Sequence, residues 1–568
     1  MDRKTIRITG AQLSFPVGAI QQNKSTILNC IEIAEQVESD IVIFPELALT
    51  GYPPEDLLLR ESFVGKNFAV LEELAEFSSS TSAIIGFVDR NLVENKVDKY
   101  TRGIANAAAV IQNGDVKGIY HKCFLPNYSV FDEARYFAKG NKPESLFWYE
   151  EVAVGINICE DIWVENGPSL NQVKNGASLI VNINASPFDI NKSESRKKIV
   201  VERAKSLKVP IVYLNMVGGQ DELVFDGGSF VVNKNGEIIH QSPQFEEEIF
   251  HLDIEVEINQ INEKSNLKLR DKKLVLKKNK FSDALSKEES IYKALKLGLF
   301  DYVTKNKFKK VLIGLSGGID SALTATIAVD ALGNENVIGV AMPSKYNSND
   351  SLIDAKQLAE NLNIEFKIIE IENLVDGFRE KVSLNIQDQL SQTTDENLQS
   401  RVRGNLLMAL SNQTGAMVLS TGNKSEMAVG YSTLYGDLAG GFALLKDLYK
   451  TEVYKLSNFR NQLSNVIPKN SIEKEPSAEL RPNQLDKDSL PEYPLLDKIL
   501  QMYIEQDLSS EKIISSGIDS DIVYDVLEKV DKNEYKRKQV SPGVKLTEKA
   551  FGKDRRMPIT NTYIRERN

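Results

Sequence analysis

Short apolar runs separated by turn-forming residues dominate the first part of the chain. The runs are rich in Ile, Val and Ala, and Gly, Asn and Pro interrupt them, which is typical of β-strands. Strands are predicted over residues 6–13, 40–46, 83–88, 107–112, 152–159, 179–184, 211–215 and 229–233. Between the first two strands, apolar residues recur at positions 27, 31, 34 and 37, and this spacing predicts an amphipathic helix. The pattern indicates a layered α/β domain, with parallel or antiparallel pairing left open.

A more regular alternation of strands and helices begins near residue 286. Strands are predicted over 311–315, 337–342 and 366–371, and helices over 321–331 and 352–363. Such alternation indicates a parallel, doubly wound sheet. Residues 256–285 lose the periodicity and are densely charged, which is typical of a linker or interdomain arm. We therefore predict domains at 1–255 and 286–568 joined by a linker at 256–285, and a loop over the polar, proline-containing stretch 469–490.

Composition narrows the classes of protein that fit this pattern. A chain of 568 residues is expected to form more than one domain, because single cores rarely grow beyond ~250 residues. With 69 Lys and Arg against 80 Asp and Glu, the net charge is −11, so neither nucleic acid nor a membrane surface is an expected partner. The basic runs at 272–273 and 277–280 lie among acidic residues and are interpreted as a solvated linker. Three cysteines cannot build a disulfide framework, and no apolar run reaches membrane-spanning length. We expect a cytoplasmic protein.

Three chemically capable side chains stand at or near the ends of apolar segments. Glu46 ends the strand at 40–46, Cys159 ends the strand at 152–159, and Lys122 follows another apolar stretch. Active-site residues of layered α/β folds gather at strand ends. A thiol attacks an amide carbonyl as a thiolate and needs a base to form it. Glu46 is the candidate base, and Lys122 is the candidate partner of the oxyanion.

Other residues compete for these roles. Cys123 is a second candidate nucleophile, although in an extended segment it points to the face opposite Lys122. Cys30 lies on the predicted helix and is interpreted as a core residue. A papain-like pair would need a histidine near the thiol, and the sequence does not choose among His121, His240 and His251. Taken singly, a cysteine, glutamate or lysine at such a position is more often structural than catalytic.

The segments around these residues resemble the nitrilase superfamily of carbon–nitrogen hydrolases. The similar segments are Phe-Pro-Glu-Leu at 44–47, His-Lys-Cys-Phe-Leu-Pro-Asn-Tyr at 121–128, Phe-Asp-Glu-Ala-Arg-Tyr-Phe at 131–137, Asn-Ile-Cys-Glu-Asp at 157–161 and Asn-Ala-Ser-Pro-Phe at 184–188. The resemblance implies an αββα sandwich with Glu46 as base, Lys122 as oxyanion partner and Cys159 as nucleophile. Its glutaminase members imply an L-glutamine site formed by Tyr128, Glu133, Ser186 and Lys192. Glu133 resembles the second glutamate beside the triad, and some members carry arginine at the position of Lys192.

A glycine-containing loop joins the predicted strand at 311–315 to the predicted helix at 321–331. Its sequence is Ser-Gly-Gly-Ile-Asp-Ser at 316–321. The glycines let backbone N–H groups close around an anion, and the helix N-terminus favours negative charge. The loop lacks the Gly-Lys-Ser/Thr ending of the common P-loop, which disfavours γ-phosphoryl transfer. Asp320 is the candidate ligand for Mg²⁺, which prefers oxygen atoms.

This loop resembles that of the ATP pyrophosphatases, and the rest of the region is similar to the NAD synthetase family among them, in its glutamine-dependent form. The similar segments lie at 342–348, 397–403, 420–426, 435–437, 476–480, 533–537 and 551–556. The implied fold is a doubly wound parallel sheet of the adenine nucleotide α-hydrolase-like type. The implied ATP site consists of Gly314, Leu315, Ser316, Gly317, Gly318, Ile319, Asp320, Ser321 and Thr421. Asn397, Glu426 and Lys536 are the implied contacts to deamido-NAD, and Asp320 and Glu426 are the implied Mg²⁺ ligands. Lys450 and Ser477 are weaker candidates for ATP phosphate contacts.

Together the two resemblances imply an enzyme that frees ammonia from L-glutamine and uses ATP to install it on deamido-NAD through an acyl-adenylate. They imply Mg²⁺ as cofactor and ATP as co-substrate. We also expect a homo-oligomer with an enclosed ammonia route from Cys159 toward the 316–321 loop.

One alternative is another ATP-dependent amidotransferase or thiolase, acting on a different carboxylate or on a tRNA base. The excess of acidic over basic residues argues against a tRNA substrate. Another is a binding or scaffold protein with degenerate sites, and the intact Glu46, Lys122, Cys159 and Asp320 argue against it.

Overall fold

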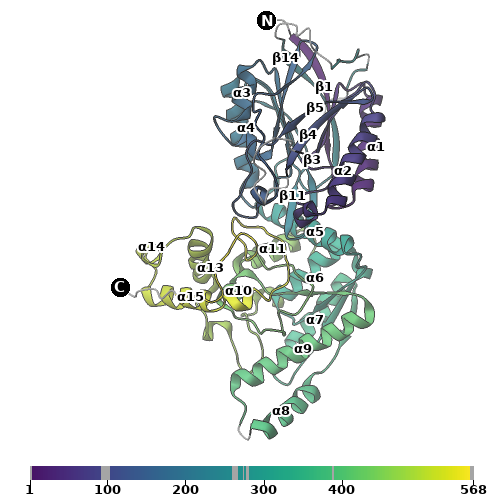
Figure 1. The fold of residues 1–568 in the computed structure, drawn as a ribbon. Coiled ribbons are helices and arrows are strands. Elements are labelled where there is room, and N and C mark those ends of the chain that lie inside the picture. The colour runs from purple at the N-terminus through teal and green to yellow at the C-terminus, as the bar shows by residue number, and fades with distance from the viewer. Residues whose placement is uncertain are drawn as a thin grey trace. The chain divides into compact units, whose positions relative to one another are not determined.

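The structure is a computed structural model, and it describes residues 3–90, 103–258, 267–272, 274–276, 281–386 and 389–562. Its contacts divide the chain into two compact units, which are described separately (Figure 1). Unit 1 comprises Met1–Gln220 with Val224–Leu285, and unit 2 comprises Asp221–Leu223 with Ser286–Asn568. Within the predicted linker at 256–285, residues 259–266, 273 and 277–280 lie outside the described residues, and the remainder belongs to unit 1.

Two six-stranded sheets form the centre of unit 1 in the part of the chain that the structure describes, with the orders β14-β1-β2-β3-β4-β5 and β13-β12-β9-β8-β7-β6. The first consists of β1 (Arg3–Gln12), β2 (Ile41–Ile43), β3 (Ser82–Arg90), β4 (Ile104–Gln112), β5 (Asp115–His121) and β14 (Glu248–Glu257). The second consists of β6 (Leu146–Tyr149), β7 (Val152–Ile158), β8 (Leu179–Asn184), β9 (Ile211–Asn215), β12 (Phe230–Val232) and β13 (Ile238–Gln241). A separate hairpin pairs β10 (Val217–Gln220) with β11 (Leu223–Asp226).

Parallel strands occupy the middle of both sheets, and antiparallel strands flank them. β1, β2 and β3 are parallel, as are β7, β8 and β9, whereas the outer strands pair antiparallel. The sheets share a buried apolar core that includes Ile8, Ile43, Ile156 and Val181. Every residue of β7 is buried, as expected for a strand that is covered on both faces.

Helices cover the outer faces of this pair of sheets. α1 (Ile20–Gln36) and α2 (Glu61–Glu76) pack on the first sheet, and α3 (Pro168–Lys174) and α4 (Lys192–Leu207) pack on the second (Figure 1). The apolar stripe of α1 contains Cys30, which is fully buried in the core between helices and sheet. The predicted αββα sandwich is therefore confirmed, and so is the interpretation of Cys30 as a core residue.

A five-stranded parallel sheet with the order β17-β16-β15-β18-β19 forms the centre of unit 2 as far as this unit is described. Its strands are β15 (Val311–Gly314), β16 (Val337–Ala341), β17 (Glu365–Ile368), β18 (Met417–Ser420) and β19 (Phe442–Ala443). α6 (Ile319–Leu332) follows β15, and α7 (Asn349–Leu362) follows β16. α9 (Gln392–Thr414) packs on β15 and β18. The predicted doubly wound parallel sheet is confirmed.

The other helices of unit 2 lie around this sheet and in the last part of the chain (Figure 1). They are α5 (Lys287–Lys305), α8 (Glu372–Ile386), α10 (Lys424–Val429), α11 (Lys450–Leu463), α12 (Lys469–Glu473), α13 (Tyr493–Leu500), α14 (Ser510–Ser515), α15 (Ser520–Lys532) and α16 (Glu534–Arg537). Across the described ranges, no helix combines the length and the apolar character that crossing a bilayer requires.

The prediction of a continuous loop over 469–490 is wrong at its start, because α12 forms there. This helix is polar in sequence, and a tertiary contact holds it: Asn470 Nδ2 donates to Asp354 Oδ2 of α7 at 2.6 Å. Two predicted strands were also too long, since β2 ends at Ile43 and β17 ends at Ile368. In both places the chain leaves the sheet while its sequence is still apolar.

Candidate active sites

Cys159 lies where β7 gives way to a short helical turn (Cys159–Ile162). Its backbone has φ +44°, a conformation that costs a non-glycine residue of order 1–3 kcal/mol and often marks a functional position. The next strand of the sheet, β8, runs parallel to β7 and pairs Ile183 with Ile158. The segment that follows β8 therefore begins beside Cys159, at the carboxyl ends of the two strands.

Glu46, Lys122 and Glu133 form a buried cluster. Lys122 Nζ donates to Glu46 Oε1 at 2.7 Å and to Glu133 Oε1 at 2.8 Å. Asn106 Nδ2 donates to Glu46 Oε1 at 2.7 Å, and the Ala185 backbone N–H donates to Glu46 Oε2 at 2.9 Å. These bonds hold both oxygens of Glu46 in place in the turn that follows β2. The structure thus brings Glu46 next to Lys122 and Glu133, although 76 positions separate it from Lys122.

The electrostatics of this cluster determine the resting state of the thiol. Burial raises the pKa of Cys159 well above its usual value, and the Glu46 carboxylate adds to the rise. Burial alone would lower the pKa of Lys122, but the charges of Glu133 and Glu46 reverse this effect and raise that pKa, so Lys122 is a stable cation. The thiol therefore rests as S–H, and a base must accept its proton before it can attack.

Glu133 differs from Glu46 in having one free oxygen. Tyr52 OH donates to Glu133 Oε1 at 2.9 Å, whereas Glu133 Oε2 is buried and has no hydrogen-bond partner among the described residues. Burial raises the pKa of Glu133 to about 7. An unpaired buried acceptor is costly, so this oxygen is suited to accept a hydrogen bond from a ligand.

Asp161 joins the segment that carries Lys122 to the segment that carries Cys159. Its Oδ1 accepts from the backbone N–H groups of Cys123 and Phe124 at 3.1 and 2.9 Å. Its Oδ2 accepts from the Ile158 N–H and from Tyr120 OH at 3.1 and 2.9 Å. Cys123 itself lies in the core between the sheets, with Tyr120 OH 3.5 Å from its Sγ. Its sulfur also lies 3.6 Å from the His121 carbonyl oxygen.

The three histidines all have partners elsewhere in unit 1. His121 Nε2 lies 2.7 Å from Asp89 Oδ2, and His251 Nδ1 lies 2.9 Å from Thr9 Oγ1. His240 stacks on Phe250 with ring centroids 4.1 Å apart. The geometry therefore favours the glutamate–lysine–cysteine arrangement over a papain-like Cys–His pair.

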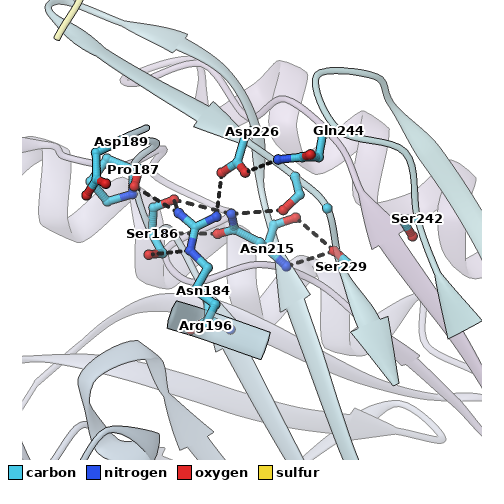
Figure 2. Close-up of polar contacts among 12 residues, drawn as sticks. Asn184, Ser186, Pro187, Asp189, Arg196, Asn215, Asp226, Ser229, Ser242 and Gln244 are labelled. Atoms are coloured by element: carbon cyan, nitrogen blue, oxygen red, sulfur yellow. Dashed lines mark hydrogen bonds and ion pairs between the residues drawn. The ribbon is translucent and has the colours of Figure 1, made fainter. Parts of the chain in front are cut away.

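The residues predicted to contact glutamine lie around the same strand ends. Tyr128 is half exposed, and its OH donates to Glu160 Oε2 at 2.9 Å, next to Cys159. Lys192 starts α4, and its Nζ lies 5.3 Å from the ring centroid of Trp163. Burial lowers the pKa of Lys192, with a further contribution from the charge of Arg196. Ser186 is buried, and polar contacts from Arg196 and Asn215 surround it (Figure 2).

The segment 316–321 in unit 2 lies between β15 and α6 as predicted, except that α6 already begins at Ile319, so Asp320 and Ser321 stand in its first turn. Ser321 Oγ accepts from the Ser316 N–H at 3.3 Å and donates to the Gly318 carbonyl at 3.0 Å, which keeps the loop tightly curved. Gly317 has φ +80°, and a Cβ atom there would lie 2.2 Å from the Ser351 carbonyl oxygen. Only glycine fits this position without displacement of α7. The other residues predicted for ATP are Gly314, at the end of β15, the buried Leu315 and Ile319, and Thr421, directly after β18.

Asp320 and Glu426 converge on one lysine. Lys450 Nζ lies 2.5 Å from Asp320 Oδ2 and 3.1 Å from Glu426 Oε1. Asn423 Nδ2 donates to Asp320 Oδ1 at 3.0 Å, and Asn423 also caps α10, which carries Glu426. Two carboxylates fit Mg²⁺, which often takes one or two from the protein and completes its shell with water and phosphate oxygens. No group of three or more His, Cys, Asp or Glu able to hold a metal ion occurs within the described part of the chain, so the nucleotide would have to supply further ligands.

The other residues predicted for deamido-NAD meet at the turn after α10. Asn397 Oδ1 accepts from Thr433 Oγ1 at 2.8 Å. Lys536 Nζ donates to the carbonyls of Gly430 and Ser432 at 2.7 and 2.9 Å. The turn thus connects α9, α10 and α16 within unit 2. Ser477, a weaker candidate for ATP, is engaged in a local turn, where its Oγ donates to the Gln484 carbonyl at 2.5 Å.

Several residues that shape these sites were not singled out from the sequence. Asn106 is a polar residue within the apolar run of β4, and this contrast was a usable signal. Asp161 lies within a segment already matched to the nitrilase superfamily. Tyr52 and Asp226 gave no local signal, because their partners Glu133 and Arg196 are distant in the sequence.

The fold and the two sites define a carbon–nitrogen hydrolase domain joined to an ATP-using synthetase domain. Family models agree: Carbon-nitrogen hydrolase matches residues 7–262, and NAD synthase matches residues 291–540. The glutamine-dependent NAD(+) synthetase of Aquifex aeolicus is 45% identical over 99% of this chain and 100% of its own length. That of Thermotoga maritima is 46% identical over 99% of both chains. The chain belongs to the family of glutamine-dependent NAD(+) synthetases.

Solved structures are similar over the same length. Glutamine-dependent NAD+ synthetase from Acinetobacter baumannii, in complex with ADP, has a TM-score of 0.75 and 41% identity, covering 98% of this chain and 99% of that one. A glutamine-dependent NAD(+) synthetase from Cytophaga hutchinsonii has a TM-score of 0.82 at 21% identity, covering 98% of both chains, and shows the shared fold. The predicted family, fold class and enzyme class, an ATP-dependent ligase with a glutaminase domain, are thus confirmed.

Proposed function

We propose that this chain hydrolyses L-glutamine in unit 1 and uses the ammonia in unit 2 to convert deamido-NAD to NAD, with ATP cleaved to AMP and pyrophosphate. The observation that carries the proposal is the cluster of Glu46, Lys122 and Cys159 at neighbouring strand ends, in one chain with a phosphate loop that carries Asp320. Family membership supports the combination, because the relatives named above are glutamine-dependent NAD(+) synthetases.

In the glutaminase half, Glu46 accepts the proton of the Cys159 thiol, and the sulfur attacks the amide carbon of glutamine. Lys122 stabilises the oxyanion together with a backbone N–H at the strand end. Ammonia leaves with the proton returned by Glu46, and a water molecule then releases glutamate from the thioester. The unpaired Glu133 Oε2 is suited to accept from the amide N–H of the substrate. Tyr128, Ser186 and Lys192 are proposed to bind the amino-acid end.

In the synthetase half, the carboxylate of deamido-NAD attacks the α-phosphorus of ATP, and pyrophosphate leaves. Ammonia then attacks the acyl carbon of the adenylate, and AMP leaves. The proposed ATP site is the 314–321 segment with Thr421, where backbone N–H groups and the N-terminus of α6 favour the phosphates. The proposed deamido-NAD contacts are Asn397, Glu426 and Lys536.

Mg²⁺ is the proposed metal; Asp320 and Glu426 would hold it, and it would supply positive charge that offsets the negative charge of the phosphate oxygens and of the leaving pyrophosphate. Lys450 neutralises the same two carboxylates. A metal ion bound to those carboxylates would leave the Lys450 ammonium able to contact the phosphate oxygens of ATP. The chain is further proposed to be a cytoplasmic homo-oligomer in which ammonia from Cys159 is consumed before it mixes with solvent. A reactive adenylate would otherwise hydrolyse while it waits for nitrogen.

The test is NAD formation from deamido-NAD, ATP and Mg²⁺, with glutamine or ammonium chloride as the nitrogen source. Wild-type protein should use both donors. Cys159→Ala should abolish glutamine-dependent synthesis and leave ammonia-dependent synthesis within about twofold of wild type, because the thiol acts only in amide hydrolysis. Cys123→Ala is the matched control and should retain both activities. Equal loss of both activities in Cys159→Ala would contradict two separable sites, and no NAD from either donor would refute the proposed reaction.

A further inference from the structure

Arg196 is a buried arginine of α4 that none of the predicted roles includes. It is 3% exposed, and its guanidinium points at the segment between β8 and α4 (Figure 2). Its Nε donates to Ser186 Oγ at 3.2 Å. Its Nη2 donates to the carbonyls of Ser186 and Pro187 at 2.7 and 2.8 Å, and its Nη1 donates to Asp226 Oδ1 at 2.6 Å.

These bonds leave Arg196 little capacity to bind a substrate directly. A guanidinium has five N–H donors, and four of them have acceptors within the protein. Asp226 neutralises the charge, and its second oxygen accepts from Gln244 Nε2 at 2.9 Å. A buried arginine with a paired charge and four of its five donors engaged acts through the groups it holds.

The group it holds is the turn that carries Ser186, and this turn also touches the catalytic cluster. Asn215 Oδ1 accepts from the Ser186 N–H at 2.9 Å. One residue earlier, the Ala185 N–H donates to Glu46 Oε2 at 2.9 Å. The turn is thus fixed to Glu46 at its start and to Arg196 further along, so Arg196 sets where Ser186 stands relative to the reacting amide.

We propose that Arg196, braced by Asp226, is a positioning residue that orients the Ser186 hydroxyl to bind the α-carboxylate of the amide donor. An arginine N–H can only donate, so Ser186 Oγ is the acceptor in that contact and its own proton can go to a second acceptor, for which the neighbouring Tyr213 hydroxyl competes with the substrate. With that proton, the Ser186 hydroxyl donates a hydrogen bond to an oxygen of the α-carboxylate of L-glutamine. The inference rests on the proposed glutaminase function. It adds that Arg196 and Asp226 set the affinity for the α-amino-acid end of glutamine.

Lysine cannot reproduce this arrangement. The planar fork of arginine reaches a hydroxyl, two carbonyls and a carboxylate at once, whereas a lysine ammonium is a single point on a flexible stem. Arg196→Lys keeps the charge beside Asp226 and releases the turn. Its effect should therefore fall on glutamine binding, and the chemistry at Cys159 should be preserved.

The experiment compares Arg196→Lys with Arg203→Lys, the same change on the same helix at a residue whose Nη1 donates to the distant Glu165 carbonyl. For Arg196→Lys, KM for glutamine should rise about tenfold or more, with kcat within about threefold of wild type. Ammonia-dependent synthesis and the rate at which iodoacetamide alkylates Cys159 should both stay within about twofold, because neither needs an amino-acid contact. Arg203→Lys should leave all four quantities unchanged.

A second variant separates the loss of positioning from misfolding caused by an unpaired buried charge. Arg196→Met with Asp226→Asn removes both buried charges together, so no unpaired charge remains, and it should show the same rise in KM. An unchanged KM in Arg196→Lys, or a fall in kcat and in Cys159 alkylation without a change in KM, overturns the positioning role. Absence of glutamine-dependent turnover in the wild type would instead overturn the proposed function itself, so the two failures are distinguishable.

Discussion

The ammonium of Lys450 lies 2.5 Å from Oδ2 of Asp320. The same Nζ atom lies 3.1 Å from Glu426 Oε1, and Lys450 is buried. Without a cation between them, these two partly buried carboxylates would repel each other. Lys450 therefore stabilises the site before any metal arrives, and a metal ion that binds there has to compete with it.

Lys450→Met tests this competition. NAD formation should fall at least about tenfold with either nitrogen donor, because both reactions need the same adenylate. Mg²⁺ should raise the Tm of the variant more than that of the wild type, because the ion then meets carboxylates that are no longer neutralised. Differential scanning calorimetry with and without Mg²⁺ measures this. Lys455→Met, on the same helix and paired at the surface with Glu452, is the control, and an equal gain in Tm for Lys450→Met and wild type would contradict the proposed metal site.

The acid–base behaviour of Asp161 predicts a pH-dependent stability. Burial is the largest cause that raises the pKa of Asp161, from 3.8 to about 6, although Ile158 N–H, Lys122 and Tyr120 favour its charged form. The folded state thus binds this proton more readily than the unfolded state. Its contribution to stability is full below about pH 4 and is lost as the pH rises through about 6, a change on the order of 3 kcal/mol.

Asp161→Asn removes this titration. The Tm of the wild type should exceed that of the variant by more at pH 5 than at pH 7, because the wild type gains stability from protonation at the lower pH. The variant should also be less stable at both pH values, since in either orientation its amide N–H₂ faces at least one backbone N–H, which can only donate. Thermal melts at the two pH values measure both effects. The exposed Asp115→Asn serves as control, and a Tm difference that narrows toward pH 5 would refute the argument.

Gly317 provides a steric test of the phosphate loop. Gly317→Ala should abolish NAD formation with both donors and leave the basal glutamine hydrolysis, measured without ATP and deamido-NAD, intact, because a Cβ atom 2.2 Å from the Ser351 carbonyl oxygen must displace the loop. Gly333→Ala is the matched control, since Gly333 also has positive φ but no described atom within 4 Å of an added Cβ. It should lower stability by about 1 kcal/mol and retain activity. Equal activities in the two variants would show that the loop tolerates the clash.

Ammonia transfer can be followed with isotopes. If ammonia is consumed before it reaches solvent, ¹⁵N-ammonium in the buffer should not enter NAD while unlabelled glutamine turns over. Glutamate release should also be slow until ATP and deamido-NAD occupy the second site, because coupling between two sites acts in both directions. Mass spectrometry of NAD and a glutamate assay give the two readouts. Free incorporation of label, with glutaminase activity indifferent to the other ligands, would exclude this transfer.

The strands and helices of the chain were largely predictable, whereas their pairing was not. The run at 152–159 became β7 and the run at 179–184 became β8. By contrast, β14 pairs antiparallel with β1 although some 240 residues separate them, with Arg3 opposite Glu257. Periodicity reports which faces are apolar and cannot say which distant strand covers them. The polar helix α12 was missed for a related reason, since a tertiary contact to Asp354 stabilises it.

The chemical groups of the sites were visible as residue types before their geometry was known. Glu46, Lys122 and Cys159 stood out because short matched segments surround them, and the structure places Lys122 Nζ 2.7 Å from Glu46 Oε1. The resemblance favoured Cys159 over Cys123, and the structure adds a physical difference between the two thiols. The charges of Glu46 and Lys122 act on the thiol of Cys159, whereas the neighbours that act on the thiol of Cys123 include Asp161 and Tyr120.

The local sequence was enough to predict which segments are helices and strands, where the phosphate loop lies and which strand ends at the nucleophile. These features depend on backbone propensities and motif spacing, which act over a few residues. Contacts such as those between Arg196 and Asp226, or between Lys450 and Asp320, join residues 30 and 130 positions apart. Their existence depends on which sheets and helices pack together, and that packing follows from burying apolar surface over whole units. Protonation states depend on the same packing, since burial is the leading influence on the pKa values of Cys159, Glu133 and Asp161. The sequence therefore showed which residue types can do the chemistry. Only the folded chain determined the distances between them, their protonation states and the residues that hold them in place.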